Sequence, residues 1–363
     1  MKNIGIIGTG AIAPAYMTGL SAFPEDTQVV ACADLNFERA SAFAQQYGFE
    51  AMSIDGLLAA DHIDIILNLT IPAAHATVSQ QIIDAGKHVY LEKPLAITLD
   101  DGQAVMERAH KKGLRVGCAP DTFLGAGGQT ARRLIDEGAI GQPVSANAFM
   151  MSHGPDSWHP NPFFYFVEGG GPMLDMGPYY LTALVNLLGP IASVAGMTNR
   201  AFTERAAGHE AIRGQNIPVT IDTHVSGLMR FQSGVVGTII TSFDTWKSTL
   251  PRIEVHGTKG SLIIPDPNTF GGDVMLYTPE TGEWQTATHQ HRGDIQRGIG
   301  VADMARCIEA NAPHRANGAI ALHVLETMLA FGQSSAEETF VTIENQVERP
   351  PALPANLENN TEG

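Results

Sequence analysis

Asp175 and Tyr179 stand four residues apart, in a segment that opens with three glycines at 169–171. On an α-helix this spacing puts both side chains on one face. Oxidation of a carbinol by hydride transfer needs a group that takes the hydroxyl proton, and a phenol can do so where nearby positive charge lowers its pKa. We therefore expect Tyr179 to act as the base and Asp175 to orient the hydroxyl. The alternative is that Tyr179 is a core aromatic and Asp175 only a helix cap.

Lys93 follows an apolar segment at 88–91, and Pro94 restricts it to an extended or turn conformation. In a doubly wound sheet, ligands bind beyond the carboxyl ends of the strands. We therefore expect Lys93 to reach a substrate oxygen and to favour deprotonation of a neighbouring acid–base group. Without these neighbours it would be an ordinary surface lysine.

The segment at 8–13 fits the pattern G-x-G-x-x-A and lies between an apolar strand and a helix. Gly8 would permit a tight turn, Gly10 would let the backbone approach a pyrophosphate, and Ala13 would keep helix and strand close. Asp34, at the end of the next strand, can accept hydrogen bonds from ribose hydroxyls and repel a 2′-phosphate. Leu35 and residue 36 supply no arginine for a phosphate, so NAD is favoured over NADP. The alternatives are glycines that serve packing alone and a solvated turn acid at position 34.

The first 120 residues alternate short apolar segments with helical patterns. We predict strands at 3–8, 28–34, 63–68, 88–91 and 114–118, and helices at 12–22, 37–47, 75–85 and 98–112. This alternation is typical of the α/β Rossmann class, with a doubly wound parallel sheet. The following residues predict a helix at 125–137, strands at 143–151, 191–198, 220–231, 235–244, 252–257 and 261–264, and a late helix at 317–333. Ser233-Gly234, between two of these strands, predicts a hairpin turn. They indicate an α+β domain with a mostly antiparallel sheet.

Composition and charge exclude several classes of partner. The 363 residues are 44% hydrophobic and 17% charged, and the formal net charge of −16 argues against nucleic acid and anionic membranes. Three widely spaced cysteines indicate reduced thiols in the cytoplasm. The apolar run at the N-terminus continues into the glycine turn, which favours a core strand over a signal peptide.

A loop at 151–162, just before the predicted catalytic helix, is dense in His, Trp and polar groups. Sugar sites combine an aromatic platform with polar side chains, so we expect substrate contacts from His153, Trp158 and His159. Asp121 and Phe123, where the chain enters the second domain, are further candidates. Both loops could also be purely structural.

A second polar loop carries His289, His291 and Arg292, with Asp294 nearby. As a metal site this arrangement is weak, and we predict no metal. We expect His291 and Arg292 to contact the substrate, which an anionic substituent on a sugar would suit.

Several of these motifs together resemble the Gfo/Idh/MocA oxidoreductase family. They are the G-x-G-x-x-A turn, His75 after Thr70-Ile71-Pro72, the segment Gly86-Lys87-His88-Val89-Tyr90-Leu91-Glu92-Lys93-Pro94, and the Gly-Gly-Gly…Asp-x-Gly-x-Tyr helix. The resemblance spans nearly the whole chain. It implies a Rossmann domain at 1–120 and an α+β substrate-binding domain at 121–348 whose open sheet mediates a homo-oligomer (dimer or tetramer). The residues at 349–363 are rich in Pro, Asn and Glu, and this composition predicts a flexible tail.

The resemblance also implies residue roles. Lys93 and Asp175 match the family's catalytic Lys and Asp, while Tyr179 stands where many members have His. The residues expected to contact the cofactor are Gly8, Gly10, Ala11, Ile12, Asp34, Leu35, Thr70, Pro72, His75, Glu92 and Lys93. Those expected to contact the substrate include Lys93, Asp175 and Tyr179. The family oxidises or reduces sugars and cyclitols with a nicotinamide.

We therefore predict an NAD-dependent dehydrogenase that acts on a hydroxyl of a sugar, glycoside or cyclitol. One alternative is an NAD-dependent glycosidase that oxidises a 3-hydroxyl transiently, eliminates the aglycone, adds water and reduces the ketone again. It would need a further base, for which His153 or His159 could serve. Another alternative is a cofactor-binding sensor, which the intact Lys93, Asp175 and Tyr179 disfavour.

Overall fold

The computed structural model describes residues 1–354, and the chain divides into two compact units. Of the described residues, unit 1 comprises Met1–Ala126, His291–Leu322 and residues 353–354. Unit 2 comprises Gly127–Gln290 and His323–Ala352. The domain division at residue 120 stays a prediction, and the chain returns to unit 1 late in the sequence.

Unit 1 is built on a six-stranded sheet in the order β3-β2-β1-β4-β5-β6, in which every pair is parallel. Its strands are β1 (Lys2–Ile7), β2 (Thr27–Ala33), β3 (Glu50–Ala51), β4 (Ile65–Asn68), β5 (His88–Leu91) and β6 (Val116–Cys118). The predicted Rossmann sheet is thus confirmed. The order reverses between β1 and β4, which is where such sheets bind ligands, at the carboxyl ends of the strands.

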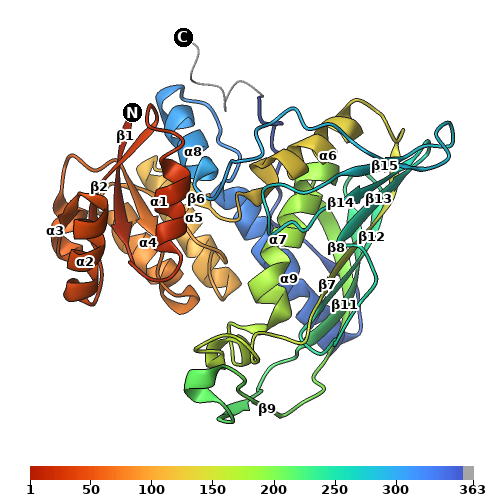
Figure 1. Ribbon diagram of the computed structural model, residues 1–363, viewed down its shortest axis with the longest axis horizontal. Coiled ribbons are helices and arrows are strands. Elements are labelled where there is room, and N and C mark those ends of the chain that lie inside the picture. Colours follow the sequence, from red (N-terminus) through yellow and green to blue (C-terminus); the bar gives the residue numbers. More distant parts are fainter. Residues whose placement is uncertain (355–363) are drawn as a thin grey trace. The chain divides into compact units, whose positions relative to one another are not determined.

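Helices connect these strands, and the sequence predicts all of them except α3 (Ile54–Ala59) (Figure 1). They are α1 (Ala13–Leu20), α2 (Phe37–Tyr47), α3 (Ile54–Ala59), α4 (His75–Asp84) and α5 (Leu99–Lys112), with 3-10 turns η1 (Pro72–Ala74) and η2 (Thr122–Leu124). Local sequence sets their ends. In α5, the Thr98 hydroxyl accepts from the Asp101 amide, and Gly113 closes the helix with a φ of 65°.

The late segment of unit 1 adds α8 (Ile299–Glu309), which packs against α1, β2 and β6. The Arg306 guanidinium pairs with both carboxylate oxygens of Asp26, each at 2.6 Å. Arg315 pairs with Asp303, which is fully buried. The Asp26–Arg306 pair joins residues 280 positions apart, so no local pattern predicts it.

Unit 2 contains a nine-stranded sheet in the order β16-β15-β14-β13-β7-β12-β11-β8-β17. Its strands are β7 (Pro143–Met151), β8 (Ile191–Asn199), β11 (His224–Phe231), β12 (Val236–Ser242), β13 (Ile253–Gly257), β14 (Ser261–Ile264), β15 (Met275–Tyr277), β16 (Trp284–Thr286) and β17 (Val341–Thr342). All its pairs are antiparallel except β7 with β12, which run parallel. This confirms the mostly antiparallel sheet, including the predicted hairpin at Ser233-Gly234 between β11 and β12.

Helices α6 (Ala126–Asp136), α7 (Gly171–Leu188) and α9 (Gly318–Glu337) lie on one side of this sheet (Figure 1). Shorter elements are η3 (Phe163–Phe166), η4 (Glu210–Ile212) and the pair β9 (Glu204–Ala206) and β10 (Asn216–Pro218). Along β11, burial alternates, with Met229 and Phe231 buried and Leu228 and Arg230 exposed. The period of two means that the second face of the sheet is open.

The predicted tail is packed in its first residues. Arg349 donates to the Asn186 carbonyl at 2.8 Å and to an Asp136 oxygen at 2.7 Å, and Leu353 is buried. The prediction of a flexible tail from residue 349 is therefore wrong for these residues, because long-range hydrogen bonds fix them. Residues 355–363 of that prediction lie outside the described residues. Within residues 1–354, no helix combines the length and apolar character that crossing a membrane requires.

Candidate active site

The glycine turn after β1 has the conformation that its sequence predicts. Gly8 has a φ of 97°, and a Cβ there would lie 2.7 Å from the Leu69 carbonyl oxygen, so only glycine fits. At Gly10 a Cβ would meet no atom within 4 Å, so open space lies beside its backbone. This turn leads into α1 at the carboxyl end of β1, where the free amides of a helix start can bind a pyrophosphate.

Asp34 is the most heavily hydrogen-bonded acid at this edge. Its carboxylate accepts from the Thr9 amide and hydroxyl at 2.8 and 3.0 Å, from the Asn36 amide at 2.9 Å, and from Arg39 Nε and Nη2 at 3.1 and 2.6 Å. Burial alone would raise the pKa of Asp34, but the hydrogen bonds from Arg39 and Thr9 hold it below its usual value. The acid is therefore ionised, while Leu35 beside it is 94% exposed.

Arg39 is a site residue that sequence reasoning missed. It lies in the first turn of α2 and binds Asp34 with two nitrogens, although the positions directly after Asp34 hold no arginine. Asn36 caps α2 through the Arg39 amide, and this cap brings the arginine back beside the end of β2. The signal in the sequence was the Asn-x-x-Arg spacing after the strand.

Lys93 follows β5 and is half-buried. Its amide donates to a Glu92 carboxylate oxygen at 3.1 Å, and the other oxygen accepts from the Tyr16 hydroxyl at 3.0 Å. Arg297 Nε lies 3.7 Å from Glu92. Glu92 is thus held inside unit 1 and fixes the backbone of Lys93, while its predicted cofactor contact stays a prediction.

His75 connects the ends of two neighbouring strands. Its ring nitrogens lie 2.6 Å from the Pro94 carbonyl oxygen and 3.1 Å from that of Thr70, and the side chain is 1% exposed. Burial is the main cause that lowers the pKa of His75. Because its polar atoms face backbone carbonyls, the ring positions the Lys93–Pro94 segment against Thr70. Its predicted cofactor contact, like that of Pro72, stays a prediction.

Two predicted substrate residues of unit 1 are buried. Asp121 is 0% exposed, and one carboxylate oxygen accepts from the Gly298 and Gly300 amides at 2.8 and 3.0 Å, at the start of α8. Phe123 is 4% exposed. The hydrogen bonds of Asp121 to these two amides argue against its direct contact with the substrate, while the role of Phe123 stays a prediction. The reason is that the late segment covers this loop, which the sequence alone does not reveal.

The two predicted substrate residues of the second polar loop, His291 and Arg292, contact other groups of the protein. His291 Nε2 lies 3.1 Å from the Leu353 carbonyl oxygen, and Arg292 forms a two-nitrogen ion pair with Asp294 at 2.6 and 2.9 Å. Their roles as substrate residues stay predictions. Within residues 1–354, no group of three or more His, Cys, Asp or Glu side chains could hold a metal.

In unit 2, α7 carries the predicted acid and phenol one turn apart. Asp175 is half-buried and Tyr179 is 5% exposed. The helix begins at Gly171, whose φ is 92°, and Pro172 in its first turn suits a helix start. Pro178 lies inside the helix, between Asp175 and Tyr179. Because proline has no amide hydrogen, it cannot donate to the backbone carbonyl one turn earlier.

His159 Nδ1 accepts a hydrogen bond from the Asn161 amide at 3.0 Å. Burial lowers the pKa of His159, and this hydrogen bond and the negative charge of Asp175 partly offset the effect. Trp158 is 62% exposed and contacts His159 edge-on, with 5.4 Å between the ring centroids. His153 stacks on Trp246, an exposed residue that sequence reasoning missed. Of the predicted residues, unit 2 thus associates His159 with Asp175.

Comparisons with known proteins agree with this description. A family model described as an oxidoreductase family with an NAD-binding Rossmann fold matches residues 2–119, and the Gfo/Idh/MocA C-terminal domain matches residues 129–263. The 1,5-anhydro-D-fructose reductase of Ensifer adhaerens is 30% identical over 283 residues, which cover 77% of this chain and 78% of the relative. The chain belongs to the Gfo/Idh/MocA oxidoreductase family.

Other similar proteins also match this chain over most of its length. The D-glucoside 3-dehydrogenase of Escherichia coli strain K12 is 24% identical, over 81% of this chain and 84% of its own. A solved levoglucosan dehydrogenase in complex with NADH and L-sorbose is 22% identical over 95% of this chain and 99% of that one. Its TM-score of 0.81 shows a shared fold.

The family model describes an NAD-binding Rossmann fold, so the cofactor of this Gfo/Idh/MocA oxidoreductase is NAD. The residues present fit it, because Gly10 leaves open space at the helix start and Asp34 is an ionised acid at the end of β2. Gly8 and Gly10, with the amides of Ala11 and Ile12, would hold the pyrophosphate, and Asp34 with Arg39 would face the adenosine ribose.

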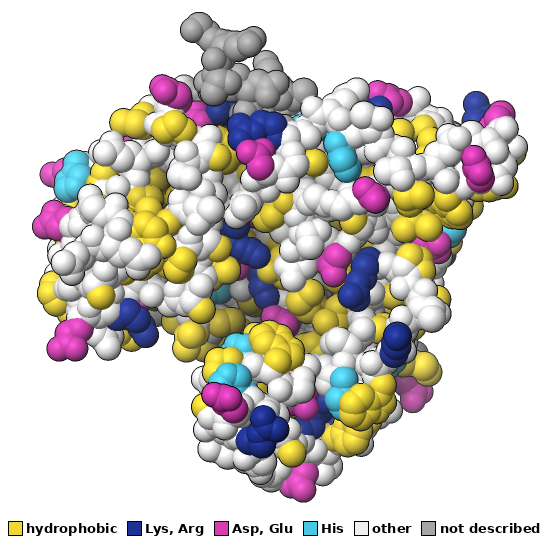
Figure 2. Space-filling model, viewed as in Figure 1, with side chains coloured by type: hydrophobic (Ala, Val, Ile, Leu, Met, Phe, Trp, Pro, Cys, Tyr) yellow, Lys and Arg dark blue, Asp and Glu magenta, His cyan; other side chains and the backbone are white. Residues whose placement is uncertain are grey.

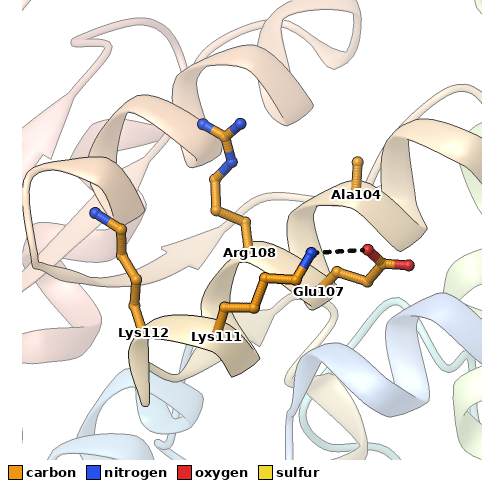
Figure 3. Close-up of a pocket in the computed structure, with 5 residues that line it drawn as sticks. All are labelled: Ala104, Glu107, Arg108, Lys111 and Lys112. Atoms are coloured by element: carbon orange, nitrogen blue, oxygen red, sulfur yellow. Dashed lines mark hydrogen bonds and ion pairs between the residues drawn. The ribbon is translucent and has the colours of Figure 1, made fainter.

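A hollow on the surface of α5 lies outside this arrangement (Figure 3). Its charged side chains are paired, with Arg108 2.5 Å from Asp84 and Lys111 3.4 Å from Glu107. Such exposed pairs contribute little to binding or stability. It is not part of the candidate site.

Proposed function

We propose that this family member is an NAD-dependent dehydrogenase that acts on a hydroxyl of a sugar, glycoside or cyclitol. The observation that carries the proposal is the Asp175–Tyr179 pair, one turn apart on α7. The named sugar reactions of the relatives support this substrate class.

The chemistry divides between three side chains. NAD, when bound, accepts the hydride from the carbinol carbon. Tyr179 takes the hydroxyl proton, Asp175 accepts a hydrogen bond from that hydroxyl and orients it, and the Lys93 ammonium stabilises the negative charge on oxygen. Glu92 and His75 hold the Lys93 backbone in place.

The test is an assay of the purified protein with NAD and a panel of sugars, inositols and aryl glycosides. Absorbance of reduced nicotinamide and release of the aglycone are followed in one cuvette. We expect NADH in amounts equal to the oxidised hydroxyl, with the glycosidic bond intact. Release of aglycone that needs NAD but accumulates no NADH would replace this proposal with the redox glycosidase.

Replacement of Asp34 with serine is expected to shift cofactor preference toward NADP. The change removes the carboxylate that repels a 2′-phosphate and releases the Arg39 guanidinium to bind it. The ratio of kcat/KM for NADP to that for NAD should rise roughly a hundredfold. The control is the double variant Asp34→Ser/Arg39→Ala, which should lose most of the gain. A gain that survives without Arg39 would contradict this role.

We also propose that the protein assembles as a homo-oligomer, a dimer or tetramer, in the cytoplasm. The open face of the nine-stranded sheet supports this, because it exposes Met197, Leu228 and Phe340 by 77%, 53% and 62%. A hollow on this face is lined by Asn147, Leu228, Arg230, Val236, Thr238 and Phe340 among others. Exposed apolar surface of this kind marks interfaces. The free cysteines Cys32, Cys118 and Cys307 suit a reducing compartment.

The variant Leu228→Glu places a charge on the open face and is expected to give monomers. Sedimentation velocity of the wild type and the variant at equal concentration measures this. The control is Leu250→Glu, at a leucine that is 49% exposed in a loop after β12, which should leave the oligomer intact. If Leu228→Glu sediments like the wild type, the interface is not this face.

A further inference from the structure

Three loops of unit 2 gather at one end of its large sheet. Because β7 and β12 run parallel, both end at this edge, and β8 ends there beside the start of β11. Residues 152–170, 200–223 and 243–250 leave this edge, and we call them the loop lobe. It contains η3 and the β9–β10 pair, at the lower end of the sheet in Figure 1. The first of its loops leads directly into α7.

Arg205 holds the loop lobe together. Its side chain is 4% exposed and donates to the carbonyls of His153 and Phe243 at 2.6 and 2.7 Å. It also pairs with Asp156 at 3.1 Å and with Asp244 at 2.5 Å. One guanidinium therefore fixes all three loops at once, because β9 contributes the arginine and the other two loops contribute its acceptors. The lobe is a positioned scaffold.

Two exposed rings lie on the outside of this scaffold. The Trp246 indole is 81% exposed and stacks on His153, with 3.5 Å between the ring centroids and 13° between the planes. Phe202 meets His153 edge-on at 6.2 Å and is 41% exposed. Figure 2 shows hydrophobic and histidine side chains side by side on this lobe. A stacked indole in solvent is a preformed flat binding surface.

A continuous series of ring contacts runs from this surface to His159, a predicted substrate residue in the loop before α7. His159 contacts Tyr165, and Arg205 bridges the rings of Phe166 and Phe202. The full series is His159, Tyr165, Phe243, Phe166, Arg205, Phe202, His153 and Trp246. Trp246 is therefore connected to His159 through packed side chains of the loop lobe.

We propose that Trp246, backed by His153, binds a second carbohydrate ring, beyond the ring that is oxidised. This inference rests on the proposed function and makes its substrate an extended glycoside, such as a disaccharide, rather than a free monosaccharide. A sugar ring presents a flat face of C–H groups that suits an indole, and hydroxyls at its edge that suit a polar rim. The continuity of the rings with His159 favours this occupant over an unrelated protein.

A binding measurement tests the platform without any turnover. The chain has three tryptophans, so fluorescence titrations with cellobiose, maltose and glucose are made on the wild type, Trp246→Phe and Trp284→Phe. We expect a disaccharide to change the emission of the wild type and of Trp284→Phe, and glucose to change it much less. The response should disappear in Trp246→Phe. A response that persists in that variant, or no response to either disaccharide, would overturn the proposal.

A kinetic measurement separates this proposal from the proposed function. For Trp246→Ala, the ratio of kcat/KM for the disaccharide to that for the monosaccharide should fall about tenfold, as loss of one ring contact predicts. In Trp284→Ala, whose indole is also exposed, the ratio should not change. NADH formation with an unchanged ratio in Trp246→Ala would keep the dehydrogenase and reject the platform. A fluorescence response to a disaccharide without NADH formation would reject the dehydrogenase instead.

The main competing occupant is a second copy of the chain. Sedimentation of Trp246→Ala at equal concentration distinguishes it, because an indole in a subunit interface would be needed for assembly. We expect the oligomeric state to stay that of the wild type. A shift to a smaller species would assign the rings to an interface and overturn the proposal.

Discussion

Replacement of Tyr179 with phenylalanine is expected to lower kcat for hydroxyl oxidation by roughly two to four orders of magnitude, the usual contribution of a positioned acid–base group. The change removes one oxygen from a side chain that is 5% exposed, so packing is preserved. NAD binding should not change, because the cofactor residues lie in unit 1. Steady-state kinetics with the best substrate, and NADH binding by fluorescence, measure the two effects separately.

The next residue along α7 provides a matched control. Tyr180 is fully buried, and burial raises its pKa well above the usual value, so it is unsuited to take a proton. One residue along a helix is a rotation of about 100°, which turns Tyr180 away from the face of Asp175. Tyr180→Phe should keep kcat within about twofold. Equal losses in the two variants would mean that helix packing, and not proton transfer, explains the effect.

Replacement of Arg205 with leucine is expected to lower the free energy of unfolding by about 3–5 kcal/mol. The substitution leaves Asp156 and Asp244 without the cation between them, and their side chains are each 10% exposed. It also removes the donor to two backbone carbonyls. Urea unfolding monitored by tryptophan fluorescence measures the loss.

Two further variants identify the cause of this loss. Arg213→Leu removes an exposed arginine of the same loop and should change the unfolding free energy by less than about 0.5 kcal/mol. Adding Asp156→Asn and Asp244→Asn to Arg205→Leu should recover part of the stability, because no buried charge then remains unpaired. If Arg205→Leu were as stable as Arg213→Leu, the loop lobe would not depend on this ion network.

Local sequence patterns predicted the parts of the fold that local chemistry determines. The glycine turn at Gly8 and Gly10 was predicted because strain and close approach restrict the residue type. Helix α5 was predicted because its caps and terminal charges are adjacent in sequence. The hairpin of β11 and β12 followed from Ser-Gly between two alternating segments.

Residues that depend on distant partners were not predictable in this way. Asp121 looked like a cleft residue, but its partners Gly298 and Gly300 are about 180 positions away and bury it. Arg205 and Trp246 had no motif, since their importance comes from loops that meet only because β7 and β12 are parallel. Arg39 was closer to prediction, because only the helix cap at Asn36 was needed to place it.

The late return of the chain has a consequence for biosynthesis. All strands of the unit 1 sheet lie within the first 120 residues. Its edge strand β6 packs against α8, and Asp26 forms its ion pair with Arg306, so both contacts need residues that are synthesised much later. On the ribosome, domains usually fold as soon as they emerge. Here unit 1 lacks one of its packing layers until residues 291–322 have been synthesised. By then most strands of the unit 2 sheet have already been synthesised, so unit 1 can complete its fold only after them. Nascent chains stopped between residues 126 and 291 would expose the apolar surface that α8 covers in the native state. The order of translation therefore affects how this oxidoreductase folds.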